Sequence, residues 1–299
     1  MATLKEISDG LAATVEAAAS SVVEVRARRG KSATGIAWDK EHILTSIHAI
    51  ENKDDVTVTY GDKSVSATVV GHDTGTDLAL LKAEGHGATP APRGSGADLR
   101  PGELVLAVGR PGELQATFGA VVSTRSRQRG WRGDGLDGLV GTDARLYQGF
   151  SGGPLLDASG KVVGINSWHY GRGETKSLPV EMATRIADSL LKHGRVPQPY
   201  LGIGTQPIYL SDDVREKTGH ASGLMVISIE AGSPAATAGV VQGDTLVGIG
   251  DAAVAGMRDL FRALRGLEVG SKQNLKVVRS GELHDLEVTV GEREEDPQE

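Results

Sequence analysis

The chain has 299 residues, of which 39% are hydrophobic and 24% charged, so its composition is that of a globular protein long enough for two domains. Its formal net charge of −7 argues against a general nucleic-acid binder, which would need a basic face, and no apolar run is long enough to span a membrane. Cysteine is absent, which excludes disulfides and thiolate metal sites.

Residues 1–195 are predicted to form a mainly β domain that begins with a helix over residues 4–20. Short β-branched runs separated by turn residues follow, and no long helix interrupts them before Val180–His193. About a dozen strands of this kind predict antiparallel barrels rather than a βαβ sheet. The runs are residues 22–26, 35–38, 42–45, 56–60, 65–70, 78–82, 104–109, 116–123, 138–142, 154–156 and 162–167.

A second, smaller domain is predicted after a linker at residues 196–199, where two prolines exclude a helix. Strands and two helices, at about residues 234–238 and 257–267, fill residues 200–291. The acidic tail, 292–299, is expected to be disordered.

Three residues of the first domain have the types and the order of a nucleophilic triad. Ser151 lies among glycines, which allow a substrate carbonyl to approach and allow the N–H groups of Gly149 and Ser151 to converge on an oxyanion. His48 closes one apolar run and Asp77 begins another. Each residue alone has a structural alternative: a flexible turn, a buried histidine or a turn cap. Together their order His, Asp, Ser is that of the chymotrypsin-type barrels.

The blocks that contain these residues, 45–48, 76–82 and 142–155, resemble the signature blocks of the HtrA/Deg serine proteases. The resemblance covers both domains. It implies a trypsin-like double six-stranded β-barrel followed by an α+β PDZ domain. It also implies ATP-independent cleavage of unfolded or damaged proteins with PDZ-dependent substrate binding or regulation. Neither a cofactor nor a metal is expected.

The resemblance also implies a pocket for the substrate side chain that precedes the cleaved bond. Its walls would be Arg145, Leu146, Asn166, Ser167 and Trp168. The family generally accepts small or medium apolar side chains there. Arg145 could instead reach toward an acidic side chain.

In the second domain, four consecutive residues resemble the loop with which PDZ domains hold a C-terminal carboxylate. They are Tyr200, Leu201, Gly202 and Ile203. A peptide would add there as a strand beside the helix at 257–267. We therefore expect C-terminal peptides as partners. Their binding could shift the oxyanion turn toward its ordered state, or could merely tether a substrate.

Phe150, the middle residue of the predicted oxyanion turn, departs from the family pattern, which usually has Asn or Asp before the nucleophile. Phenylalanine cannot hydrogen-bond the turn, so the turn is either disordered at rest or held by packing of the ring. Phe150 therefore supports an alternative function, an inactive scaffold or chaperone acting through the PDZ domain. A third possibility, an α/β-hydrolase esterase, is rejected because a strand rather than a helix follows the serine motif.

Three further expectations concern the surface and the compartment. Residues 125–132 carry four arginines around a tryptophan, and a solvated loop is expected rather than a nucleic-acid contact. Residues 1–25 contain no aromatic residue, so a homo-oligomer is expected to differ from the trimers that the family builds through N-terminal aromatics. The sequence as it stands has no signal peptide and predicts a cytoplasmic protein; the alternative is a periplasmic one whose targeting segment was removed.

Overall fold

The computed structural model describes residues 3–28, 31–50, 55–127, 136–171 and 175–293. Among these residues the chain divides into two compact units, residues 3–196 and 197–293. No helix in the described ranges is both long and apolar enough to cross a membrane.

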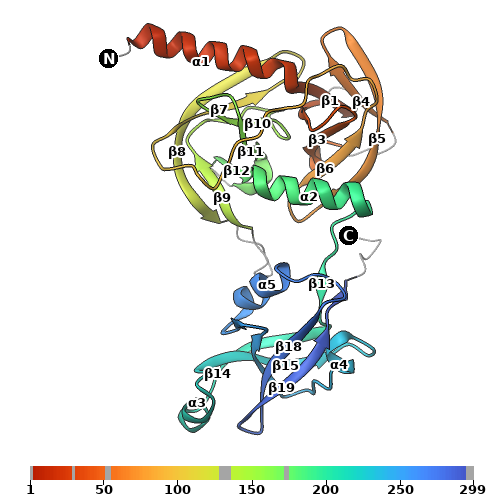
Figure 1. The fold of residues 1–299 in the computed structure, drawn as a ribbon, viewed down its shortest axis with the longest axis vertical. Coiled ribbons are helices and arrows are strands. Elements are labelled where there is room, and N and C mark those ends of the chain that lie inside the picture. The colour runs from red at the N-terminus through yellow and green to blue at the C-terminus, as the bar shows by residue number, and fades with distance from the viewer. Residues whose placement is uncertain (1–2, 29–30, 51–54, 128–135, 172–174, 294–299) are drawn as a thin grey trace. The chain divides into compact units, whose positions relative to one another are not determined.

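The described part of the first unit contains two closed antiparallel barrels of six strands each (Figure 1). Both barrels have the same strand order, in which the third strand of each pairs with its sixth. The predicted trypsin-like double barrel is therefore confirmed. The first barrel consists of β1 (Val22–Arg28), β2 (Lys31–Ala37), β3 (His42–Ser46), β4 (Val56–Tyr60), β5 (Lys63–Asp73) and β6 (Leu78–Lys82).

The second barrel includes a strand that the sequence did not predict. This strand, β12, has the sequence Thr-Lys-Ser-Leu-Pro, which lacks a β-branched run, yet it pairs with both β9 and β11 and so closes the barrel. The six strands are β7 (Leu104–Gly109), β8 (Gln115–Arg127), β9 (Asp137–Thr142), β10 (Pro154–Asp157), β11 (Val162–Asn166) and β12 (Thr175–Pro179).

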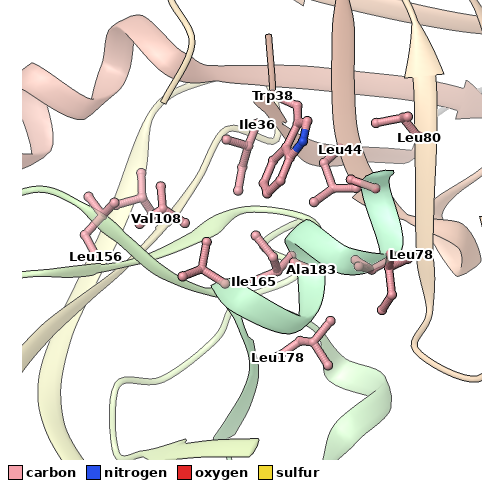
Figure 2. Packing of buried hydrophobic residues seen from close by; sticks show 14 of the residues in the cluster. Ile36, Trp38, Leu44, Leu78, Leu80, Val108, Leu156, Ile165, Leu178 and Ala183 are labelled. Carbon is pink, nitrogen blue, oxygen red and sulfur yellow. The ribbon is translucent and has the colours of Figure 1, made fainter. Parts of the chain in front are cut away.

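A hydrophobic cluster joins the two barrels to α2 (Val180–His193). Figure 2 shows Leu44 and Leu78 of the first barrel, Ile165 of the second barrel and Ala183 of α2 in this cluster, and all four are buried. The burial of these apolar side chains is the main contribution to the stability of the interface between the two barrels. The barrels are therefore held against each other, which fixes the loops that face across their junction.

The N-terminal helix α1 spans Leu4–Ala18 and ends before the predicted residue 20. Thr3 and Glu6 form a capping box at its start. At its end the chain tightens into a 3₁₀ turn, Ala19–Ser21, that leads directly into β1.

The second unit is a β-rich PDZ fold built on one antiparallel sheet (Figure 1). Its strand order β14-β15-β16-β18-β19 leaves β14 at an edge, and β17 (Ala252–Ala253) pairs with β16. Of its helices, α3 (Asp212–Thr218) was not predicted, whereas α4 (Pro234–Thr237) and α5 (Met257–Arg265) were. The main strands are β14 (Ile203–Tyr209), β15 (Ser222–Ile229), β16 (Thr245–Ile249), β18 (Lys272–Arg279) and β19 (Glu282–Thr289).

Two short strands lie at the predicted limits of the linker and the tail. Strand β13 (Pro199–Tyr200) pairs with β20 (Gly291–Glu292), and the Arg293 N–H donates to the Gln198 carbonyl at 2.9 Å. These backbone hydrogen bonds bring the end of the predicted linker and the start of the predicted tail into the second unit. The rest of the predicted tail, 294–299, lies outside the described residues.

Candidate active site

Strand pairing in the first barrel brings His48 beside Asp77. His48 lies in a 3₁₀ turn, Ile47–Ala49, that follows β3, and Asp77 immediately precedes β6. Because β3 and β6 are antiparallel neighbours with Ser46 opposite Leu78, the end of one meets the start of the other. The Ile47 N–H donates to the Asp77 carbonyl at 3.0 Å and extends the pairing by one step.

The Asp77 carboxylate holds His48 by two hydrogen bonds, one to the imidazole and one to the backbone. Nδ1 of His48 lies 2.7 Å from Oδ2 of Asp77, and the His48 backbone N–H donates to Oδ1 at 3.1 Å. Since a carboxylate only accepts, Nδ1 carries the proton and Nε2 is free to accept one. Asp77 is 2% exposed, whereas the His48 side chain is 43% exposed and accessible to a substrate.

Two hydroxyl groups, those of Ser167 and Tyr170, form hydrogen bonds to Asp77 and to the residue before it. Ser167 donates to Oδ2 of Asp77 at 2.5 Å, and the buried Tyr170 donates to the Thr76 carbonyl. Burial and the charges of Asp77 and Asp73 raise the pKa of Tyr170 well above its usual value. Ser167 was predicted as a pocket wall, but its side chain is 2% exposed and supports Asp77 instead. Tyr170 carried no sequence signal beyond its aromatic type.

The turn that carries Ser151 can be built only with glycine after the serine. Gly152 has φ +84°, and a Cβ there would overlap the Thr34 carbonyl oxygen; a Cβ at Gly153 would overlap the Val108 carbonyl oxygen. These close approaches explain the two glycines and hold the Ser151 backbone in place.

The Ser151 hydroxyl accepts a hydrogen bond from the segment that follows β11. The Trp168 backbone N–H donates to Oγ of Ser151 at 3.2 Å, and the Trp168 indole N–H donates to the Tyr147 carbonyl at 3.3 Å. Within the described residues, no hydrogen bond joins Ser151 to His48. In substrate-free enzymes this bond is often absent and forms only in the substrate complex.

Phe150 is packed in the interior, and its backbone N–H is hydrogen-bonded within the turn. Its side chain is fully buried in the core of the second barrel, and a Cβ at Gly109 would lie 2.6 Å from its ring. Its backbone N–H donates to the Tyr147 carbonyl at 3.1 Å. Of the two alternatives for this turn, the structure favours packing of the ring. The inclusion of Phe150 among the oxyanion residues is corrected: the candidate donors are Gly149 and Ser151.

The predicted pocket residues separate into exposed and interior ones. Arg145 is exposed, with its guanidinium 5.2 Å from the Tyr147 ring centre, and Trp168 is 55% exposed. Leu146 instead packs in the second-barrel core. Asn166 is fully buried, donates to the Pro154 carbonyl and accepts from Ser177, both at 2.8 Å. The pocket assignment of Leu146 and Asn166 is therefore corrected, because both side chains face the interior.

The four predicted carboxylate-loop residues of the second unit have different environments. The Tyr200 hydroxyl donates to Glu230, and burial together with that carboxylate raises the pKa of Tyr200 to about 12. Leu201 is a core residue. Gly202 has φ +76°, and a Cβ there would overlap Ser233. Ile203 begins the edge strand β14.

The edge strand β14 lies against α5. The Thr205 hydroxyl of this strand is 3.2 Å from Sδ of Met257, the first residue of α5. A strand edge beside a helix is the arrangement in which peptides add to a sheet. The arginine-rich segment predicted as a solvated loop lies mostly outside the described residues, from residue 128 onward.

Two protein-family models match this chain, one in each of its two units. A family described as "Trypsin-like peptidase domain" matches residues 33–165, and one described as "PDZ domain" matches residues 199–290.

Named relatives match most of the chain. "Protease Do-like 1, chloroplastic" of Arabidopsis thaliana is 33% identical over 282 residues, which cover 87% of this chain and 63% of the relative. A "Probable periplasmic serine endoprotease DegP-like" of Ectopseudomonas mendocina (strain ymp) is 32% identical over 267 residues, covering 86% and 56%. The chain thus spans about three fifths of the length of these relatives.

Solved structures share the fold over nearly the whole chain. The serine endoprotease from Yersinia pestis has a TM-score of 0.76 at 26% identity, covering 94% of this chain and 97% of that one. The structure "HtrA-type protease AlgW with decapeptide" has a TM-score of 0.79 at 25% identity, covering 95% and 99%.

Proposed function

Because this chain belongs to the HtrA/Deg family of serine proteases, we propose that it is an ATP-independent serine endopeptidase that cleaves unfolded or damaged proteins. Ser151 is the nucleophile, His48 the general base and acid, and Asp77 the residue that orients His48. The observation that carries the proposal is the buried Asp77 carboxylate 2.7 Å from Nδ1 of His48, which leaves Nε2 free to accept a proton.

The reaction proceeds through an acyl-enzyme. Nε2 of His48 takes the hydroxyl proton as Oγ of Ser151 attacks the peptide carbonyl, and returns it to the leaving amine when the C–N bond breaks. Water then attacks the ester by the same route in reverse. The N–H groups of Gly149 and Ser151 stabilise the oxyanion, and Asp77 stabilises the charged imidazole.

A serine-directed fluorophosphonate distinguishes the enzyme from the inactive scaffold. We expect it to phosphonylate Ser151 because the reaction requires the same base and the same oxyanion donors as acylation. Labelling is measured by intact mass, and the site by peptide mapping. Ser151→Ala serves as the control and should remain unlabelled. An unlabelled wild-type protein, folded by thermal melting, would favour the scaffold.

In the second unit, we propose that a substrate's free C-terminus binds at Gly202 and adds as a strand to β14. The glycine at φ +76° and the edge position of β14 support this site. The peptide-bound HtrA-type protease structure is a precedent for peptide recognition in a protein of this fold. Because the oxyanion turn is already packed and hydrogen-bonded within the first unit, tethering of the substrate is the better account of the PDZ contribution.

Tethering predicts different outcomes for two substrates. A peptide with a free apolar C-terminus should inhibit cleavage of a protein substrate that ends in the same sequence, because both compete for one site. Hydrolysis of a short chromogenic substrate should change less than about twofold, since a pure tether has no coupling energy. The same peptide with an amidated C-terminus is the control. Acceleration of the short substrate would instead show allosteric activation.

The compartment and the assembly are also proposals. The relative named periplasmic favours an extracytoplasmic location over a cytoplasmic one. We propose a symmetric homo-oligomer whose contacts are not made by N-terminal aromatic side chains, because residues 1–25 contain none.

A further inference from the structure

The hydroxyl of Thr34, in β2, lies between two backbone groups of the second barrel's loops. Thr34 is fully buried. The Arg110 N–H donates to Oγ1 of Thr34 at 2.7 Å, and Oγ1 donates to the Gly149 carbonyl at 2.6 Å. Because an amide N–H only donates and a carbonyl only accepts, the direction of both bonds follows from their chemistry. The single hydroxyl proton therefore belongs to the bond with Gly149.

The Thr34 backbone holds the same turn at a second point. Its N–H donates to the Ser151 carbonyl at 3.2 Å. Between these two contacts, the Phe150 carbonyl accepts from the Gly153 N–H at 3.0 Å. The peptide planes that follow Gly149, Phe150 and Ser151 are thus each held by a hydrogen bond. The plane after Phe150 carries the Ser151 N–H, so that candidate donor is held directly. The plane after Gly149, which the Thr34 hydroxyl holds, lies between the two candidate donors and restricts how the Gly149 N–H and the Ser151 N–H are turned relative to each other.

Thr34 is also tied to the strand that leads to His48. The Thr45 hydroxyl of β3 donates to the Thr34 carbonyl at 2.7 Å, and Gly35 is the strand partner of Thr45. One residue therefore connects the barrel that carries His48 with the turn that carries Ser151.

We propose that Thr34 is a positioning residue for the oxyanion hole, an assignment that rests on the protease function proposed above. Phe150 has no polar side chain with which to hydrogen-bond the turn, and its ring packs in the core. The Thr34 hydroxyl supplies the missing hydrogen bond from the first barrel. Its contribution is to the transition state, because the oxyanion donors interact most strongly with the charge that develops there.

Thr34→Val tests this role because it removes the hydroxyl and retains the branched shape. We expect kcat for a short chromogenic peptide to fall about 10- to 100-fold, with KM changed less than about threefold, since the lost interaction acts in the transition state. Binding of a peptide aldehyde, whose adduct places an oxyanion in the same site, should weaken by the same factor as kcat/KM. Thr34→Ser keeps the hydroxyl and should retain at least about a third of the wild-type kcat.

The matched control is Thr184→Val, which removes a hydroxyl that donates to the Val180 carbonyl at 2.8 Å in α2. Its kcat should stay within about twofold of wild type. If Thr34→Val does not fold, Thr34→Ala removes the same hydroxyl without the valine methyl. The proposal is overturned if the hydroxyl-free variant keeps kcat within about twofold of wild type, or if Thr34→Ser is equally impaired. Wild-type activity that disappears in Ser151→Ala tests the protease function separately.

Discussion

Replacing Ser151 with alanine is expected to lower kcat by about 10⁶-fold, because the variant lacks the hydroxyl that forms the acyl-enzyme. The variant should fold normally. The steric constraints of the turn come from Gly152 and Gly153, whose positions the substitution leaves unchanged, and alanine is smaller than serine. The oxyanion turn also survives, so residual hydrolysis of about 10³- to 10⁴-fold over the uncatalysed rate is expected.

The measurement is kcat/KM for an internally quenched peptide, together with turnover of casein as an unfolded protein. Ser189→Ala is the control, since its hydroxyl donates to the Arg195 carbonyl, two residues beyond the end of α2. It should retain wild-type rates. Ser151→Ala with casein turnover equal to that of wild type would remove Ser151 from the mechanism.

The barrels could be predicted from the sequence because most of their strands are β-branched runs bounded by turn residues. The predictions failed where tertiary contacts rather than local pattern decide the structure. Strand β12 exists because β9 and β11 leave an edge between them. Strands β13 and β20 pair residues from opposite ends of the second unit.

The candidate site shows the same division. His48, Asp77 and Ser151 could be singled out because their chemistry imposes an order and a glycine-rich neighbourhood. The residues that orient these three could not be singled out from the sequence. Ser167 and Thr34 are ordinary hydroxyl residues whose roles arise only when strands distant in the chain meet, and Thr34 contacts a residue 115 positions away. Sequence periodicity carries no information about such contacts.

Asp77→Asn is expected to lower kcat by about 10⁴-fold while leaving the backbone unchanged. Position 77 has φ 54°, and asparagine is among the few residues that tolerate this left-handed conformation. Alanine would add backbone strain to the loss of the carboxylate. The asparagine variant therefore isolates the effect of the side chain.

The hydrogen-bond donors around the carboxylate determine how the introduced amide must lie. Oδ1 of Asp77 accepts the His48 backbone N–H, so the amide oxygen has to occupy that position. The amide NH₂ then takes the place of Oδ2, 2.7 Å from Nδ1 of His48. Nδ1 must accept, and the imidazole proton moves to Nε2. An Nε2 that already carries a proton cannot take the one from Ser151.

Asp157→Asn is the matched control for this tautomer argument. Its carboxylate accepts the backbone N–H groups of Ser159 and Lys161 in the turn between β10 and β11, so it holds a turn and not an imidazole. It should keep kcat/KM within about twofold of wild type. Fluorophosphonate labelling of Asp77→Asn should slow in parallel with peptide hydrolysis, because both reactions need Nε2 as the base. A loss smaller than about tenfold in the folded variant would mean that His48 reaches the productive tautomer without Asp77.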